Sequence, residues 1–268
     1  MEPDELFSTA RAALDGAVRR LAAVICPMPD LNQPLPGESL WTAREAIAHL
    51  VTAFDLYTEI ATGTPSPLTS FTAAAFAEDN RRRIADVSEA DPTKLAFLLE
   101  DAAARFLAAL RGQPGTRTIV WHAGMSVDLT ALVELLLGEV LLHGYDIATA
   151  CRAPWTIPAS EVALVLAGYA PCYEPNVNPE TTRGLTVAYE IELRDVARVV
   201  VRFVDGRYFL EPAGGGPVDC VISADPVAWL LVGSDRLDQW SAIALGLIEA
   251  GGDRPELAAG FGDLFIFP

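Results

Sequence analysis

The sequence is poor in basic residues and in histidine. Its 268 residues include 19 Lys and Arg against 36 Asp and Glu, which gives a formal net charge of −17, and only three histidines. Nucleic-acid binders contact phosphates mainly through clustered Lys and Arg, so this charge balance argues against a nucleic-acid partner. With 51% hydrophobic and 21% charged residues, the chain is not disordered and can build a substantial core.

Cysteine is also scarce. The four cysteines lie far apart, at Cys26, Cys151, Cys172 and Cys220, and no Cys-x-x-Cys pair occurs. This pattern excludes the dense disulfide framework of small secreted proteins and the usual cysteine zinc sites. We therefore predict reduced thiols that are mostly buried, as small hydrophobic side chains.

Neither a long apolar run nor a targeting signal is evident. The longest apolar stretch, residues 129–142, is interrupted by Glu134 and Glu139 and is shorter than the roughly 20 residues that cross a bilayer. Residues 1–6 are acidic where a secretory signal would be basic. We expect a cytoplasmic protein without a membrane partner.

The first 150 residues have the periodicity of helices. Apolar residues at helical spacing predict helices over 4–24, 42–61, 71–87, 92–111 and 128–150, with a short extended piece at 118–121. The second helix has a clear start, because Thr42 and Glu45 match a capping box and Trp41 precedes them at the staple position. Four principal helices with apolar inner faces predict an antiparallel four-helix bundle.

The pattern changes after residue 158. Alternating or β-branched segments predict strands at 185–193, 196–204, 207–211 and 218–223, and Asp205-Gly206 predicts a hairpin turn. Short helices are expected at 161–170 and 226–232, and two further elements at 243–250 and 256–265. The chain as a whole is thus predicted to be α+β, with a helical domain at 1–155 and a smaller α+β domain with an antiparallel sheet at 156–268.

Two of the three histidines fall inside predicted helices. Glu139 precedes His143 by one helical turn, so both side chains project from one face, and His49 lies in the middle of the second helix. Leucines surround Glu139 in the sequence, and a carboxylate buried among them is costly unless it is paired or binds a cation. Two histidines and a carboxylate form the ligand set of catalytic zinc and related sites. The alternative interpretation is a hydrogen-bonded Glu–His pair and a separate core histidine.

Other residues carry weaker signals. His122, before the last helix of the bundle, either lines the mouth of a pocket or, the interpretation we favour, is a solvated loop histidine. Asp146 either orients the imidazole of His143 or is a surface carboxylate. The run Arg81-Arg82-Arg83 either binds an anion or, as we favour, forms a solvated helix face. Neither a Gly-rich phosphate loop nor a nucleophile elbow occurs.

Two segments carry a family resemblance. The segment Trp41-Thr42-Ala43-Arg44-Glu45-Ala46-Ile47-Ala48-His49-Leu50 and, some ninety residues later, Gly138-Glu139-Val140-Leu141-Leu142-His143-Gly144-Tyr145-Asp146-Ile147-Ala148 resemble the mycothiol-dependent maleylpyruvate isomerase family. That family belongs to the DinB-like four-helix metalloproteins. Residues 219–265 are similar to its C-terminal module, which resembles sterol-carrier-protein-2 folds, so the resemblance covers nearly the whole chain.

The resemblance implies a metal site and a thiol cosubstrate. It implies that His49, Glu139 and His143 bind one divalent ion, with zinc expected and iron, nickel or cobalt also accommodated, and that Asp146 supports the site. It further implies mycothiol as the thiol, and a basic residue of the C-terminal module for which Arg236 and Arg254 are equal candidates. The catalytic residues themselves stay unassigned.

The reaction has two forms on such a scaffold. In an isomerase, the thiolate adds to a cis double bond conjugated to a carbonyl, the new single bond rotates, and the thiolate leaves; in an S-transferase, the thiolate attacks a small electrophile and stays. We expect a metal- and mycothiol-dependent enzyme of one of these kinds, acting on a small molecule as a monomer or homodimer. The alternative is a non-catalytic protein that binds a small molecule or lipid and holds a structural metal.

Overall fold

The computed structural model describes residues 2–36 and 41–267. Contacts between Cα atoms divide them into two units. The first unit comprises the chain up to Ile157 together with Ala167–Tyr169, and the second comprises Pro158–Leu166 and Ala170–Phe267. Within the described ranges, no helix is both long and apolar enough to span a membrane.

The first unit is mainly helical, as the apolar periodicity predicts. Side-chain oxygens of Thr42, Thr72, Asp91 and Asp128 accept the backbone N–H that begins four of its helices. The elements are α1 (Pro3–Ile25), α2 (Ala43–Ala61), α3 (Ala73–Asp86), α4 (Pro92–Ala109), β1 (Thr118–Val120), η1 (His122–Gly124), β2 (Ser126–Asp128) and α5 (Leu129–Cys151).

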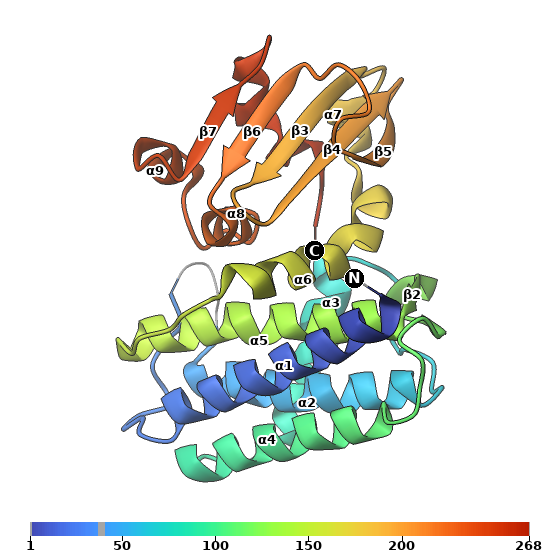
Figure 1. Cartoon of the computed structure of the whole chain (residues 1–268). Helices are drawn as coiled ribbons and strands as arrows, with labels where there is room; N and C mark the ends of the chain where they lie inside the picture. Colours follow the sequence, from blue (N-terminus) through green and yellow to red (C-terminus); the bar gives the residue numbers. More distant parts are fainter. Residues whose placement is uncertain (1, 37–40, 268) are drawn as a thin grey trace. The chain divides into compact units, whose positions relative to one another are not determined.

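Four long helices, α1, α2, α4 and α5, pack around one core (Figure 1). Helices α1 and α5 run in one direction and α2 and α4 in the other (Figure 1), so each helix has one parallel and one antiparallel neighbour. Arg44 at the start of α2 donates to the Glu89 carbonyl just before α4, and Phe54 contacts Phe106 farther along both helices. The sequence predicts that all neighbouring helices of the bundle are antiparallel. In the structure, α1 and α5 are parallel, and so are α2 and α4.

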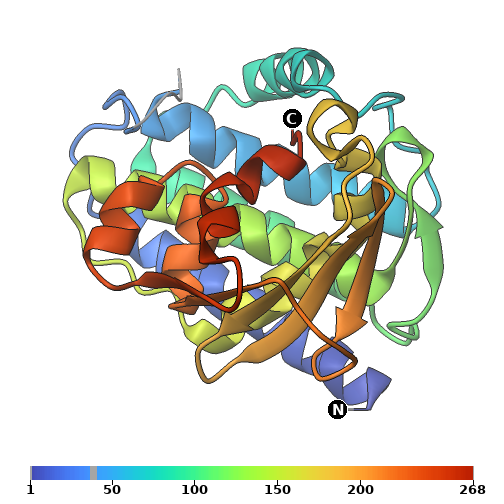
Figure 2. The same ribbon diagram turned by 90° about the horizontal axis from the view of Figure 1, so that it is seen from above.

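Helix α3 explains this difference in direction. It lies outside the four long helices, packed on α2, and crosses them steeply (Figures 1 and 2). The segment that contains α3 carries the chain back along the bundle, so that α4 starts where α2 starts. Such a crossover connection allows consecutive bundle helices to be parallel.

Helix α5 is the central element of the first unit. It is buried along most of its length because it packs against both α1 and α2. Gly144 lies directly under the indole ring of Trp155, and an added Cβ there would collide with that ring. The Trp155 indole donates from Nε1 to the Leu141 carbonyl at 3.1 Å. This close contact fixes the backbone beside His143.

The second unit contains a five-stranded sheet. Its strands follow the order β5-β4-β3-β6-β7 (Figure 1). Three of the four pairings are antiparallel, as expected, but β3 and β6 are parallel, so the sheet is mixed. Its elements are α6 (Ala159–Tyr173), η2 (Glu174–Asn176), α7 (Pro179–Thr182), β3 (Val187–Leu193), β4 (Ala197–Val204), β5 (Arg207–Pro212), β6 (Cys220–Ala224), α8 (Pro226–Val232), α9 (Gln239–Ala244), β7 (Ile248–Gly251), η3 (Pro255–Gly260) and η4 (Gly262–Leu264).

The predicted hairpin is present and the α+β class is confirmed. Asp205 and Gly206 both have positive φ and connect β4 to β5. One face of the sheet is covered by a core centred on Tyr189, Phe203 and Ile222. Helix α9 was not predicted, because its six residues are too few to show a periodicity.

The cysteines follow the prediction only in part. All four are free, but only Cys172 and Cys220 are buried. Cys151 is half-buried and Cys26 is exposed, at the end of α1 where the Pro-rich segment leaves the core. The expectation of mostly buried thiols is therefore wrong for half of them.

Candidate metal centre

Side chains from α2 and α5 converge on one point. His49, Glu139 and His143 each offer a ligand atom, and these atoms all lie within 4.8 Å of one another. The Glu139 Oε2 lies 3.2 Å from the His49 Nε2 and 3.3 Å from the His143 Nε2. Ligands at zinc–nitrogen and zinc–oxygen bond lengths in a tetrahedral site are about 3.3 Å apart. The nitrogen, nitrogen and oxygen donors therefore fit one divalent ion.

Helix α2 places His49 through its well-defined start. The capping box forms as predicted: the Thr42 N–H donates to the Glu45 carboxylate at 2.8 Å, and the Glu45 N–H donates to the Thr42 hydroxyl at 3.3 Å. Trp41, directly before this cap, places its ring 4.9 Å from the His49 ring and 5.6 Å from the His143 ring. His49 itself is 9% exposed.

Two further side chains near the site, those of Trp41 and Asn80, are not predicted from the sequence as parts of it. The sequence predicts Trp41 only as a staple residue, and the signal for its ring contacts with both imidazoles is its place directly before the cap of the His49 helix. The Asn80 side chain on α3 also acts on His49, as the smallest of the influences that raise its pKa. No sequence pattern pointed to Asn80, because its contact depends on the crossover that brings α3 against α2.

Helix α5 presents Glu139 and His143 one turn apart, as their spacing predicts. Asp146 follows, with its Oδ2 at 3.6 Å from the His143 Nδ1. Asp146 is only 4% exposed, which excludes its alternative interpretation as a surface carboxylate. A carboxylate beside the far nitrogen of an imidazole orients the ring and presents the other nitrogen to a ligand.

The protonation states of the cluster suit cation binding. Burial, the largest influence, lowers the pKa of His49, against the hydrogen bond that its ring donates to Glu139, which raises it. Burial alone would raise the pKa of Glu139, but hydrogen bonds from His143 and His49 outweigh it and hold that pKa well below its usual range. Near neutral pH the cluster therefore holds a neutral His49 and an ionised Glu139, and a bound cation would take the place of the Nε2 protons that the imidazoles donate to Glu139.

The apolar setting predicted for Glu139 belongs instead to Glu134. The Glu139 side chain is 36% exposed and faces two histidines. Glu134 is 3% exposed, and within the described part of the chain its Oε1 has no hydrogen-bond partner. Burial, followed by the charge of Asp128, raises the pKa of Glu134 to about 8. The sequence argument for Glu139 therefore described a setting that the structure gives to Glu134.

His122 is not the solvated loop histidine that we favoured. It is 3% exposed, and Ser66 Oγ lies 2.6 Å from its Nδ1. The loop before α5 folds into the short hairpin β1–β2 and turns inward through η1, which places the ring among aromatic side chains. Burial is the main reason that its pKa falls to about 4.

The arginines considered as anion-binding or substrate-binding residues form hydrogen bonds or ion pairs with residues nearby in the sequence or in the fold. Arg82 and Arg83 both bind the buried carboxylate of Asp79, at 2.6 and 2.8 Å, so this run is not simply a solvated helix face. In the second unit, Arg236 donates to the Ser234 carbonyl at 2.9 Å. Arg254 lies 4.0 Å from Asp219. None of these contacts distinguishes the two candidates for the C-terminal basic residue.

The family model for the mycothiol maleylpyruvate isomerase N-terminal domain matches residues 10–148, which is more than half of the chain. The chain belongs to this family. The match includes His49, Glu139, His143 and Asp146, and it confirms the resemblance that the two helical motifs indicated.

Solved structures agree on the fold. A crystal structure of the mycothiol-dependent maleylpyruvate isomerase is 19% identical, with a TM-score of 0.52 over 94% of this chain and 93% of that one. A histidine-to-alanine mutant of the mycothiol-dependent maleylpyruvate isomerase is 18% identical, with a TM-score of 0.55 over the same shares. At this identity the likeness concerns the fold. No curated protein matches the chain.

Proposed function

We propose that this protein is a divalent-metal enzyme that uses a low-molecular-weight thiol, mycothiol, on a small electrophile. Family membership supports the thiol, and the convergence of His49, Glu139 and His143 supports the metal. The single observation that carries the proposal is the spacing of their three donor atoms, which suits one ion. Zinc is the expected metal, because two imidazoles and one carboxylate are a common catalytic zinc set.

The protein residues hold and shape this site. A divalent ion bound there would stabilise the thiolate form of a thiol near neutral pH. Near neutral pH His49 is neutral and Glu139 is ionised, so neither side chain adds a positive charge that would oppose a cation. The carboxylate of Asp146 lies 3.6 Å from the His143 Nδ1 and favours one orientation of that ring, and Trp41 lies against both imidazole rings. Three protein ligands leave a coordination position for a small molecule.

The reaction that we propose is nucleophilic. The sulfur of the thiolate forms a bond to one carbon of a cis double bond conjugated to a carbonyl, and the double-bond electrons move onto the carbonyl oxygen. Rotation about the resulting single bond, followed by expulsion of the thiolate, gives the trans product. With another electrophile, the same attack without expulsion gives a thiol S-transferase. Isomerisation of a maleylpyruvate-like substrate is the form that the family name favours.

Metal analysis together with an activity screen tests this function. We expect the wild type to carry one divalent ion per chain, and His49→Ala and Glu139→Ala to lose it. With mycothiol, the wild type should turn over maleylpyruvate or a member of a panel of electrophiles, and treatment with a chelator should abolish that turnover. A wild type without stoichiometric metal, or turnover that survives the loss of metal, would contradict the proposal.

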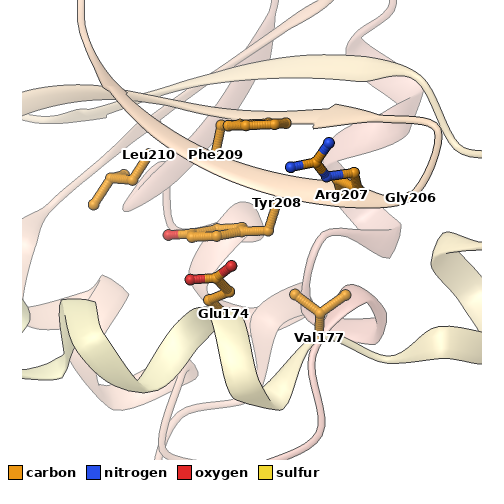
Figure 3. A pocket seen from close by; sticks show the side chains of 7 residues that line it. All are labelled: Glu174, Val177, Gly206, Arg207, Tyr208, Phe209 and Leu210. Carbon is orange, nitrogen blue, oxygen red and sulfur yellow. The ribbon is translucent and has the colours of Figure 1, made fainter. Parts of the chain in front are cut away.

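A pocket in the second unit favours the alternative of a binding protein. It has a volume of about 500 Å³ and lies where the β4–β5 hairpin faces the segment after α6 (Figure 3). The Tyr208 ring lies over the Glu174 carboxylate inside it, with Val177 beside them (Figure 3). An apolar ligand that binds the metal-free protein and is lost in Tyr208→Ala would support this alternative.

A further inference from the structure

The sheet of the second unit has an exposed edge at β5. Among the strands that the structure describes, β5 pairs with β4 alone, at the end of the order β5-β4-β3-β6-β7 (Figure 1). Two large apolar side chains of this strand are exposed, Phe209 by 37% and Leu210 by 44%. An edge strand offers unpaired N–H and C=O groups to another strand, and proteins usually cover or block such edges. Strand β5 therefore has the features of an interaction surface.

The hairpin turn determines which backbone groups of β5 face outward. A turn of two residues joins β4 to β5, and the pair of residues that closes such a turn is joined by backbone hydrogen bonds. Hydrogen-bonded and non-hydrogen-bonded pairs alternate along an antiparallel ladder, so Arg207, Phe209 and Glu211 direct their backbone groups toward β4. Tyr208 and Leu210 direct theirs away from it. In the described parts of the chain, neither of these two makes a backbone hydrogen bond to a segment outside the sheet.

The side chains of β5 alternate between the two faces of the sheet. Tyr208 points toward Glu174, on the core side of the sheet, whereas Phe209 projects from the opposite side of the strand (Figure 3). The Arg207 guanidinium lies over the Phe209 ring, 5.5 Å from its centroid. Glu211 follows Phe209 by two residues and so shares its face. One face of β5 thus carries a cation, an aromatic ring and an anion in a row.

This row of side chains is complementary to itself. If two copies of β5 pair antiparallel about a two-fold axis at Phe209, each Arg207 lies opposite the Glu211 of the other copy, and the two Phe209 rings face each other. Tyr208 of one copy then lies opposite Leu210 of the other. These are the residues whose backbone groups face outward, so each such pair can exchange both of its N–H···O bonds.

Neighbouring registers are less favourable. A two-fold axis at Tyr208 would place Glu211 opposite Asp205, which is a pair of like charges. An axis at Leu210 would place Pro212, which has no N–H to donate, opposite Tyr208. The charges and the proline therefore favour the pairing centred on Phe209.

We propose that β5 binds a second copy of this chain, so that the two sheets join antiparallel about Phe209. A second copy suits this edge better than an arbitrary extended peptide, because the charges of Arg207 and Glu211 are matched by the same strand in reverse. The proposal concerns the second unit and does not depend on the metal chemistry proposed above.

The size of the contact indicates a weak homodimer. A ladder over residues 207–211 is expected to bury less than the roughly 1,200 Å² of a stable complex. Exposed apolar surface continues beside it, since Phe267 contacts Tyr173, whose ring stacks on Tyr208. We therefore expect a dissociation constant on the order of 10 µM.

Charge reversal provides a test that is specific for this register. Arg207→Glu and Glu211→Arg each place like charges opposite each other in their own homodimers, whereas a mixture of the two variants restores opposite charges at both positions. In sedimentation velocity, the wild type should show a monomer–dimer equilibrium. Each variant alone should dimerise at least about tenfold more weakly, and the mixture should recover the wild-type affinity to within about threefold.

Two further variants control for folding and for net charge. Glu211 also pairs with Arg202 of its own chain at 3.0 Å, so the thermal unfolding of Glu211→Arg is compared with that of the wild type. Leu210→Pro removes an outward N–H and no hydrogen bond to β4, and it should abolish the dimer while the chain stays folded. Arg111→Glu makes the same charge change as Arg207→Glu at an exposed position after α4, and it should dimerise like the wild type.

Amide hydrogen exchange tests the pairing residue by residue. The Phe209 N–H, which bonds to β4, should be protected at every protein concentration. The N–H groups of Tyr208 and Leu210 should exchange rapidly in dilute protein and become protected as the dimer forms.

Three results would overturn the proposal. The first is a wild type that stays monomeric well above the expected dissociation constant. The second is a dimer that neither Arg207→Glu nor Leu210→Pro weakens, because another surface would then hold it. The third is protection of the Tyr208 and Leu210 amides only after an extended peptide is added, because the edge would then bind a different chain.

Discussion

Two carboxylates on α5, five residues apart, have pKa values that are shifted in opposite directions. Glu139 is partly exposed and ionised, because hydrogen bonds from His143 and His49 hold its pKa low. Glu134 is buried, its Oε1 has no partner among the described residues, and its pKa rises to about 8. Burial, together with the charge of Asp128, thus produces a neutral acid, whereas converging partners produce a potential ligand. The difference teaches that a metal site is recognised by its partners more than by its apolar setting.

The histidines repeat this contrast. His49 and His143 face one carboxylate oxygen and each other, with ring centroids 5.0 Å apart. His122, which is only 3% exposed, faces a hydroxyl and three aromatic rings, and its pKa falls to about 4. The first pair suits a cation, whereas burial keeps the third histidine neutral.

The largest expected effect is on metal affinity, and it tests the difference between the two carboxylates directly. Glu139→Gln removes the anionic donor and should lower the affinity for the divalent ion by about a thousandfold or more. Glu134→Gln, the matched substitution on the same helix, should leave the affinity unchanged, because the native Glu134 is already neutral at neutral pH. Competition with a chelator, followed by elemental analysis, measures both affinities. Equal loss in the two variants would refute the distinction.

The next effect concerns stability and pH. The folded pKa of Glu134, about 8, lies above its ordinary value of 4.5, so unfolding releases a proton between these values and stability falls as the pH rises through that window. Glu134→Gln removes this dependence and should raise the free energy of unfolding at pH 8 by about 2–4 kcal/mol relative to the wild type. Urea unfolding at pH 5 and pH 8 checks this. A variant less stable than the wild type at pH 8 would show that Glu134 is paired.

A smaller effect on metal affinity is expected for Asp146, because its carboxylate acts on the metal site only through His143. Asp146→Asn keeps the shape of the side chain but weakens its hold on the His143 Nδ1, and the metal affinity should fall by about 10- to 100-fold. Nickel or zinc titration with a chelating indicator measures this change. Unaltered affinity would reduce Asp146 to a packing residue, whereas a loss as large as that of Glu139→Gln would make it a ligand.

Much of the fold could be predicted from local signals. The bundle helices have strong periodicity and clear caps, and the β4–β5 hairpin has its Asp-Gly turn, so each appeared close to its predicted position. The direction of α4 and the parallel pairing of β3 with β6 could not be predicted, because they depend on long-range connections that leave no local pattern. Helix α9 was missed because six residues give no period.

The candidate metal site likewise has some features that follow from local sequence patterns and others that depend on long-range packing. The i, i+4 spacing of Glu139 and His143 is a local property, and it placed both on one face of α5. The addition of His49 required the assumption that two predicted helices pack together, and the structure brings them together. Asn80 reaches the site from α3, and His122 is buried by a loop that folds inward, so neither arrangement was visible in the sequence.

The smallest expected effect sharpens the account of Glu134. Asp128 caps α5 by accepting from the Ala131 N–H at 2.8 Å, and its charge is the second cause of the raised pKa of Glu134. Asp128→Asn keeps a good cap but removes the charge, so the pKa of Glu134 should fall by less than about one unit. The upper midpoint of the pH–stability curve should move down with it, while the metal affinity stays unchanged. A midpoint that does not move would leave burial as the whole cause, and a larger fall would mean that Glu134 is less buried than its packing indicates.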